Sequence, residues 1–331
     1  MIVAVTGASG YLGRAVAAEL VASGHEVRTL QRRPSAIRGA TDILGSVTDS
    51  DAVARALEGV EGVVHLAAKV SLAGETAEFR AVNVEGTRIL LDSAERVGAS
   101  RFVQVSSPSV AHAGRALTGV GAEPASPRNA RGEYARTKAE GELLALDRDS
   151  AGLKVVAVRP HLVWGPGDTQ LVGRILDRAR RGRLPLLDGG RALIDSTYID
   201  NAATGISAAL ARADEAHGRP FVITNGEPRP VGELLAGICL ASGVRPPAWS
   251  VPAGLARAAG SMIERVWAVR PGTDEPPMTR FLAGQLSTAH WFDQRETRRA
   301  LAWSPSVSID EGLRRLTAGT ASCSRFAAPP A

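Results

Sequence analysis

Short β-branched and aliphatic runs alternate with longer Ala- and Leu-rich segments through the first half of the chain. The apolar runs have the length of strands, and the segments between them repeat apolar positions with the spacing of a helix. The predicted strands are Ile2–Thr6, Glu26–Leu30, Val63–Ala67, Arg101–Ser106 and Lys154–Arg159. The predicted helices between them are Arg14–Ser23, Asp51–Leu57, Ala77–Arg96 and Glu133–Arg148. Strands joined by helix-length crossovers pair in parallel, so the pattern predicts a doubly wound α/β sheet.

The regular alternation ends near Pro166, after which Pro and Gly clusters separate short helical pieces. We therefore expect a sheet domain over residues 1–165, with 192–215 returning to it. Residues 166–191 and 216–317 are expected to form a smaller, mostly helical substrate-binding part. Ser308 with Glu311 three residues later predicts a capping box that opens a last helix, Ile309–Leu316. Residues 318–331 are small and polar, and we predict a disordered tail there.

Composition narrows the function classes. The chain has 331 residues, 44% of them hydrophobic and 22% charged, with a net charge of +5. The basic residues are dispersed, without an aromatic-interleaved strip or a recognition helix, so we expect no nucleic-acid partner. The apolar run Val251–Val269 contains Arg257, Glu264 and Arg265, which argues against a transmembrane segment. No cluster has metal-ligand spacing, so no metal is predicted. The first strand has no charged leader before it, which favours a cytoplasmic protein.

A glycine-rich turn follows the first predicted strand and opens the first helix. Gly7 permits a tight turn, Gly10 allows close approach of a pyrophosphate, and Gly13 allows helix and strand to pack closely. The amides at the helix N-terminus favour phosphate. The sequence therefore predicts a Rossmann-type dinucleotide site whose turn contributes Gly7, Ser9, Gly10, Tyr11, Leu12 and Gly13.

The end of the second strand bears on the choice between NADP and NAD. An NAD site places a carboxylate there for the ribose 2′-hydroxyl, whereas an NADP site places arginine against the 2′-phosphate. Gln31 and Arg32 occupy this region with no acidic residue nearby in the sequence. We therefore predict NADP as the cofactor, with NAD less favoured, and Arg32 as its phosphate ligand.

Tyr134 and Lys138 lie four positions apart near the start of a predicted helix, and so on one face. A phenol titrates near pH 10, and a nearby ammonium that lowers this pKa would make Tyr134 a usable acid and base. Ser107 and Ser109 follow the strand Arg101–Ser106, at the sheet edge where ligands bind in parallel α/β folds. A hydroxyl at that edge can hold a substrate oxygen while Tyr134 exchanges the proton.

In this order, the glycine turn, strand-end serine and Tyr/Lys pair resemble the extended short-chain dehydrogenases/reductases of the NAD-dependent epimerase/dehydratase superfamily. The resemblance continues through Val63–Ala68, Asn83–Thr87 and Arg159–Asp168. It implies that Ser107 is the catalytic hydroxyl, Tyr134 the acid/base and Lys138 the residue that tunes its pKa and bonds the nicotinamide ribose. It further implies cofactor contacts by Val47, Leu66, Ala67, Ala68, Pro160, Leu162 and Val163. Ser109 and His161 are expected to line the substrate pocket.

The C-terminal half is similar to the 3β-hydroxysteroid dehydrogenase branch, which includes bacterial reductases of 2-alkyl-3-oxoalkanoates. The similar segments are Tyr198–Ala202, Phe221–Pro228 and Gln285–Asp293. This resemblance implies an NADP-dependent oxidoreductase that interconverts a ketone and a secondary alcohol on an apolar substrate, such as a 3-oxo acyl, steroid-like or polyketide-like compound. It also implies a homodimer formed through the helices Ala77–Arg96 and Glu133–Arg148.

Two other functions remain open at this stage. A nucleotide-sugar epimerase would retain bound NAD, which Arg32 disfavours. A redox-sensing regulator would bind NADP without turnover, and such proteins often lack a pair like Tyr134 and Lys138.

Overall fold

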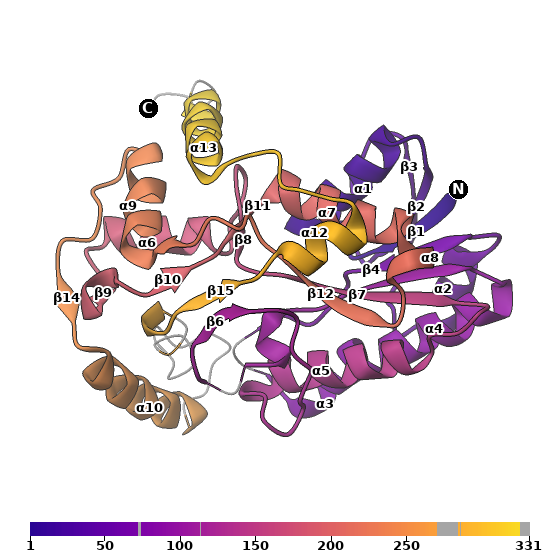
Figure 1. The fold of residues 1–331 in the computed structure, drawn as a ribbon, viewed down its shortest axis with the longest axis horizontal. Helices are drawn as coiled ribbons and strands as arrows, with labels where there is room; N and C mark the ends of the chain where they lie inside the picture. The colour runs from indigo at the N-terminus through magenta and orange to yellow at the C-terminus, as the bar shows by residue number, and fades with distance from the viewer. Residues whose placement is uncertain (72–73, 113, 270–283, 285, 325–331) are drawn as a thin grey trace.

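A parallel seven-stranded sheet forms the centre of the protein in the computed structural model (Figure 1). The structure describes residues 1–331 except 72–73, 113, 270–283, 285 and 325–331. The strand order is β12-β7-β5-β4-β1-β2-β3. The bounds are β1 Ile2–Thr6, β2 Glu26–Gln31, β3 Ala40–Leu44, β4 Gly62–His65, β5 Arg101–Val105, β7 Lys154–Pro160 and β12 Arg219–Ile223. The predicted doubly wound fold of the Rossmann type is thus confirmed.

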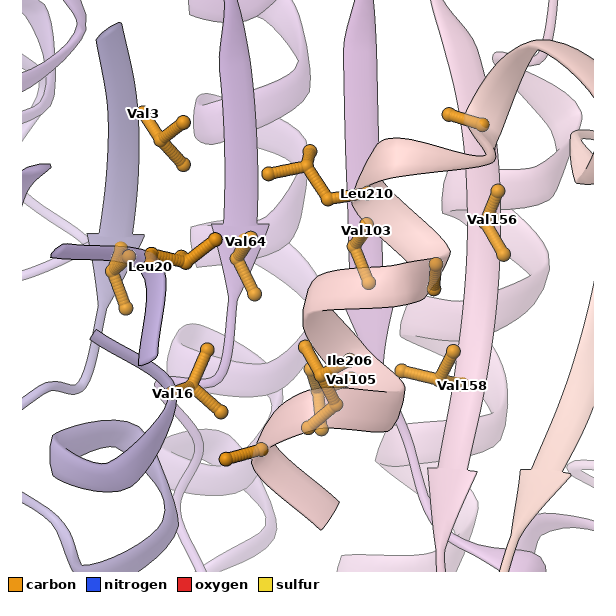
Figure 2. Packing of buried hydrophobic residues seen from close by; sticks show 14 of the residues in the cluster. Val3, Val16, Leu20, Val64, Val103, Val105, Val156, Val158, Ile206 and Leu210 are labelled. Carbon is orange, nitrogen blue, oxygen red and sulfur yellow. The ribbon is translucent and has the colours of Figure 1, made fainter. Parts of the chain in front are cut away.

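Alternate side chains of the central strands enter different cores. Val3 and Val5 face one hydrophobic cluster, whereas Ala4 between them faces the other. Because consecutive side chains of a strand point to opposite faces, a sheet covered on both sides needs nearly continuous apolar strands. Figure 2 shows the first cluster, in which Val64 and Val103 of the sheet lie near Leu210 of helix α7.

Helices cover both faces of this sheet. One face carries α1 (Tyr11–Ala22), α7 (Ile199–Ala211), α8 (Ala213–Ala216) and α12 (Arg295–Leu301). The other carries α2 (Ser50–Leu57), α4 (Gly86–Val97) and α5 (Gly132–Asp147). The helix predicted over Ala77–Arg96 is divided into α3 (Thr76–Arg80), a π-helical turn Ala81–Glu85, and α4. A π turn of this kind is frequent next to functional sites.

The C-terminal part packs around its own hydrophobic cluster, which includes Trp164 and Tyr198. It contains small sheets as well as helices. The helices are α6 (Val172–Arg180), α9 (Val231–Ala241), α10 (Ala253–Val269) and α13 (Ile309–Ser324). The strands are β6 (Leu117–Val120), β8 (Val163–Trp164), β9 (Leu186–Leu187), β10 (Leu193–Ile194), β11 (Thr197–Tyr198), β13 (Arg229–Pro230), β14 (Ser250–Val251) and β15 (His290–Phe292). Because β6 pairs with β15, the first half of the chain contributes to this part.

Three details differ from the sequence prediction. Strand β3 was not expected, because this edge strand is half polar and largely exposed. Strand β12 joins the main sheet beside β7, although residues 216–317 were expected in the substrate part. Helix α13 continues through Ser324, so the tail expected to be disordered from residue 318 is helical at its start. Residues 325–331 and Gln285 lie outside the described residues.

Two smaller predictions concern helices. The Glu311 amide donates to Ser308 Oγ at 3.2 Å, which gives one half of the predicted capping box. Within the described ranges, no helix combines the length and the apolar character needed to cross a membrane.

Candidate active site

The glycine turn lies where the ends of three parallel strands meet. Gly7 has a φ of +77°, and its amide donates to the carbonyl of Leu30 at the end of β2 (2.9 Å). A Cβ at Gly7 would lie 2.9 Å from the Cα of Ala67, which follows β4. A Cβ at Gly13 would lie 2.2 Å from the Gly7 oxygen. Neither position admits a side chain, because the turn packs directly against the backbone after β4 and against the start of helix α1.

Helix α1 begins at this turn with its N-terminus unshielded by a side chain. Gly10 is the N-cap and makes no side-chain capping bond. Ser9 and Gly10 are exposed, whereas the Tyr11 and Leu12 side chains pack against the C-terminal cluster. Burial raises the pKa of the Tyr11 phenol, which keeps it neutral. The turn therefore fits a dinucleotide pyrophosphate, with backbone amides rather than the Tyr11 and Leu12 side chains as its available donors.

The loop after β2 lies beside the turn and exposes Arg32. Gln31 is buried, and its Nε2 donates to Oδ1 of Asp42 on β3 at 3.0 Å. The sequence suggested no acidic residue near this loop, and that expectation was wrong. Asp42 lies eleven positions from Gln31 in the sequence, and only the β2–β3 pairing brings it close.

Three hydroxyl groups form a chain at the end of β5. The Ser109 hydroxyl donates to Ser107 Oγ at 3.0 Å, and the Ser109 amide also approaches that oxygen at 3.3 Å. Ser107 in turn hydrogen-bonds the Tyr134 side chain. Ser109 was expected to contact substrate, but here its hydroxyl is directed to Ser107. The structure thus brings together residues from the end of β5 and from α5, as the roles predicted for Ser107 and Tyr134 require.

Lys138 lies four positions after Tyr134 on α5, and it is almost fully buried. Its Nζ donates to the carbonyl of Val105 at 2.6 Å. Burial lowers the pKa of Lys138 to about 8, and the nearby carboxylate of Glu142 opposes this decrease. Burial also raises the pKa of Tyr134, and the hydrogen bond with Ser107 offsets part of that increase. The expected lowering of the Tyr134 pKa by Lys138 is therefore not seen here; Ser107 is the group that lowers it.

A buried polar network supports this corner of the site. His65 contacts Thr6 Oγ1 through Nδ1 (2.7 Å) and Thr87 Oγ1 through Nε2 (3.1 Å). Burial and the charge of Lys138 lower the pKa of His65 to about 3, so the ring is neutral. Asn83, in the π turn, donates to Thr137 Oγ1 on α5 at 3.0 Å. These bonds connect β1, β4, the π turn and α5, and they fix the helix that presents Tyr134.

Other residues expected at the cofactor lie at neighbouring strand ends. Leu66, Ala67 and Ala68 form the partly exposed loop after β4. Pro160 ends β7, Val163 begins β8, and Leu162 between them has an unusual φ of +43°. Val47 is buried against Gly86 of α4, where an added Cβ would lie 2.7 Å from Val47 Cγ2.

His161 belongs to a histidine cluster that the sequence did not predict. Its Nδ1 contacts the carbonyl oxygen of Asp195 at 2.7 Å, and burial lowers its pKa to about 4. His290 stacks edge-on with His112 at 4.6 Å and lies 6.0 Å from His161, between ring centroids. The three histidines are 49 and 129 positions apart in sequence, so no linear spacing could reveal the cluster. Among the described residues, no group of three His, Cys, Asp or Glu could hold a metal ion.

Comparisons with known proteins agree with this geometry. The model of the "NAD dependent epimerase/dehydratase family" matches residues 3–224. A 2-alkyl-3-oxoalkanoate reductase of Stenotrophomonas maltophilia is 39% identical over 97% of this chain and 100% of its own length. A 4-hydroxy-2-methyl-3-oxo-4-farnesyl-3,4-dihydroquinoline-1-oxide ketoreductase of Stigmatella aurantiaca is 31% identical, over 94% of each chain. A 3-beta-hydroxysteroid dehydrogenase of Mycolicibacterium neoaurum is 29% identical over 94% of this chain and 89% of its own.

Solved structures support the fold. MoeE5 in complex with UDP-glucose and NAD matches 97% of this chain and 99% of its own, at 24% identity and a TM-score of 0.75. An Agrobacterium tumefaciens protein of the short-chain dehydrogenase/reductase superfamily with bound NAD matches 98% of each chain, at 24% identity and a TM-score of 0.75. The chain therefore belongs to the NAD dependent epimerase/dehydratase family, as a nicotinamide-dependent oxidoreductase of ketone–alcohol pairs.

Proposed function

We propose that the protein reduces the 3-oxo group of a 2-alkyl-3-oxo acid or a related apolar ketone with NADPH. The hydroxyl chain Ser109–Ser107–Tyr134 beside the buried Lys138 carries this proposal. The choice of substrate class rests on the 39% identical relative, which aligns along its entire length. The quinoline ketoreductase, whose name also contains a 3-oxo group, supports a reaction at such a ketone.

The proposed mechanism assigns one task to each polar side chain. NADPH, when bound, supplies the hydride for the carbonyl carbon. Ser107 and Tyr134 donate hydrogen bonds to the carbonyl oxygen, which becomes more negative as the reaction proceeds. Tyr134 then transfers its phenolic proton to that oxygen. Ser109 holds Ser107 in place by donating to its oxygen.

Lys138 supports the end of β5 that leads to Ser107. Its ammonium donates to the carbonyl of Val105, two residues before Ser107, and Ser107 is the group that lowers the pKa of Tyr134. We also assign to Lys138 a hydrogen bond with the nicotinamide ribose, next to Leu162 and Val163. His161 is neutral and buried, so it lines the substrate side without supplying charge.

NADP is proposed over NAD because of the loop after β2. Arg32 is exposed, and within the described part of the chain it has no hydrogen-bond or ion-pair partner. A guanidinium in this position suits the 2′-phosphate, which NAD lacks. Gln31 holds no charge that would repel the phosphate.

The experiment is a coupled assay of NADPH oxidation with purified protein. The substrates are a 2-alkyl-3-oxoalkanoate, a 3-oxosteroid and UDP-glucose, each tested with NADPH and with NADH. We expect turnover of the 3-oxo acid with NADPH. Because epimerisation consumes no net NADPH, the UDP-glucose reaction is followed by analysis of the sugar product. Formation of an epimeric UDP-sugar with no turnover of the apolar ketones would instead establish an epimerase. Binding of NADPH without turnover of any ketone would favour the regulator.

Two further features complete the proposal. The chain divides into a sheet domain and a C-terminal substrate part. Of residues 192–215, which were expected to return to the sheet, α7 and α8 cover the sheet, which includes strand β12, whereas β10 and β11 belong to the substrate part. A homodimer forms through the layer of α4 and α5, where Leu143 is 42% exposed. Sedimentation of the native protein and of Leu143→Glu tests this assembly: a native monomer would contradict it.

A further inference from the structure

The loop after β2 is fixed by one carboxylate on the neighbouring strand. Asp42 Oδ1 accepts hydrogen bonds from Ser35 Oγ (2.6 Å), Thr29 Oγ1 (2.6 Å) and Gln31 Nε2 (3.0 Å). Its Oδ2 accepts from the Ser35 amide at 2.9 Å. Asp42 therefore holds both the end of β2 and a residue four positions further along.

Ser35 is the anchor inside the loop. Its side chain is fully buried, and its Oγ also accepts from the Ile37 amide at 3.3 Å. The next residue, Ala36, has a φ of +55°, which a residue with a Cβ adopts only when its surroundings enforce it. The bonds of Asp42 and Ser35 thus define one conformation for the segment between them.

That segment presents two arginines to solvent. Arg32 and Arg33 are exposed, and neither has a hydrogen-bond or ion-pair partner among the residues that the structure describes. The loop starts two residues beyond Leu30, whose carbonyl accepts from the amide of Gly7 in the glycine turn. The arginines are therefore placed on the side of the turn where the adenosine ribose of a dinucleotide lies.

The charges here are also arranged for a phosphate. A carboxylate at this edge of the sheet could accept hydrogen bonds from the ribose hydroxyls, as in NAD sites. The Asp42 carboxylate instead accepts hydrogen bonds from four donors of its own chain. Burial raises the pKa of Asp42, and the hydrogen bonds from Ser35 and Thr29 lower it. The net result is a pKa below the ordinary value, so Asp42 stays ionised. Arg32 and Arg33 carry two positive charges against the one negative charge of Asp42, so the net charge of the loop is positive.

We propose that Asp42, acting through Ser35, is a positioning residue that holds Arg32 and Arg33 ready for the 2′-phosphate of NADP. The inference rests on the proposed use of NADP. A loop backbone that is already fixed does not have to be ordered when the cofactor binds, so only the arginine side chains lose conformational freedom at that step. Asp42 itself does not touch the cofactor.

The test compares dissociation constants of NADPH and NADH by isothermal titration calorimetry, for the wild type, Asp42→Ala and Asp42→Asn. We expect each variant to weaken NADPH binding about tenfold, the size expected when the backbone of about one loop residue must be ordered on binding. NADH, which has no 2′-phosphate, should change less than about threefold. Asp42→Asn keeps the shape of the side chain, so it tests the hydrogen bonds between Asp42 and the loop even if Asp42→Ala fails to fold.

Two controls separate this inference from the choice of cofactor. Asp51→Asn removes an exposed carboxylate in the first turn of α2 that makes no hydrogen bond with the loop, and it should leave both constants unchanged. Arg32→Ala with Arg33→Ala should abolish the NADPH preference. If the double arginine variant loses its preference for NADPH but Asp42→Asn keeps it, the positioning role of Asp42 is wrong and the proposed use of NADP is retained. Equal weakening of NADPH and NADH by Asp42→Asn would likewise reduce Asp42 to a structural role. A wild type that binds NADH as tightly as NADPH would overturn both proposals.

Discussion

The two ends of the proposed cofactor site are built in opposite ways. At the reacting end, Lys138 is buried and bonded to Val105, and Ser107 is bonded by Ser109. At the adenosine end, Arg32 and Arg33 are exposed, and only the backbone beneath them is fixed. One end has prearranged side chains, and the other has a prearranged loop with free side chains.

This difference follows from what each end has to do. Proton transfer depends on pKa values and on distances of a few tenths of an ångström, which burial and a low local dielectric control. Recognition of a phosphate needs charge near the surface, where salt screens it but the ligand can enter and leave. Substitutions at the first end should change turnover, and those at the second should change affinity.

The largest effect is expected for Tyr134→Phe. Loss of the proton donor should lower kcat by about 10²–10⁴-fold, the usual range for a positioned general acid. The dissociation constant of NADPH should stay within about threefold, because the crevice keeps its shape. Steady-state kinetics together with calorimetric binding distinguish the two quantities. An unchanged kcat would remove Tyr134 from the mechanism.

The second effect concerns pH. Lys138 has a pKa of about 8 in the folded protein, so its ammonium is lost above that pH. We expect kcat to fall toward tenfold per pH unit above about pH 8, as one proton is lost. A pH profile of kcat from 6 to 10 measures this decrease. Lys138→Met should have a low rate with no such decrease.

Stability should respond to the same titration in the opposite direction. The folded pKa of Lys138 lies below its ordinary value of 10.5, so the unfolded chain binds more protons between about pH 8 and 10.5. The contribution of Lys138 to the free energy of unfolding therefore rises with pH through this window, while activity falls. Comparing urea unfolding of the wild type and Lys138→Met at pH 8 and 10 isolates this contribution. A wild-type advantage that shrinks as pH rises would contradict it.

A smaller effect is expected at the adenosine end. Arg32→Ala should raise the KM for NADPH roughly tenfold at low salt and leave kcat unchanged. The difference from wild type should shrink in 0.5 M salt, because exposed charges are screened. The matched control is Arg38→Ala, which removes an exposed arginine that lies beyond the segment fixed by Asp42 and Ser35. A lower kcat with an unchanged KM for NADPH would contradict this prediction and assign Arg32 to the reacting end of the site.

The smallest effect is expected for Ser109→Ala. This change removes one hydrogen bond to Ser107 and should lower kcat about three- to tenfold, the size of one such bond. Ser109→Thr keeps the hydroxyl and should recover part of the rate. An increase in the KM for the ketone with kcat unchanged would instead support the direct substrate contact that the sequence suggested.

The sequence by itself determined strands β1, β2, β4, β5 and β7, the glycine turn and the placement of Tyr134 and Lys138 on one helix. These features depend on neighbours in the chain: alternating apolar positions define strands, and a spacing of four places two side chains on one helix face. Their positions were predictable because local geometry alone decides them.

The tertiary structure decided which distant groups meet. Asp42 reaches the loop of Arg32 only because β2 pairs with β3, and His112, His161 and His290 come together from three separate segments of the chain. It also decided that Ser109 bonds Ser107 and that burial, more than Lys138, controls the pKa of Tyr134. Desolvation and contacts between distant residues depend on packing in three dimensions, and no spacing along one chain encodes them.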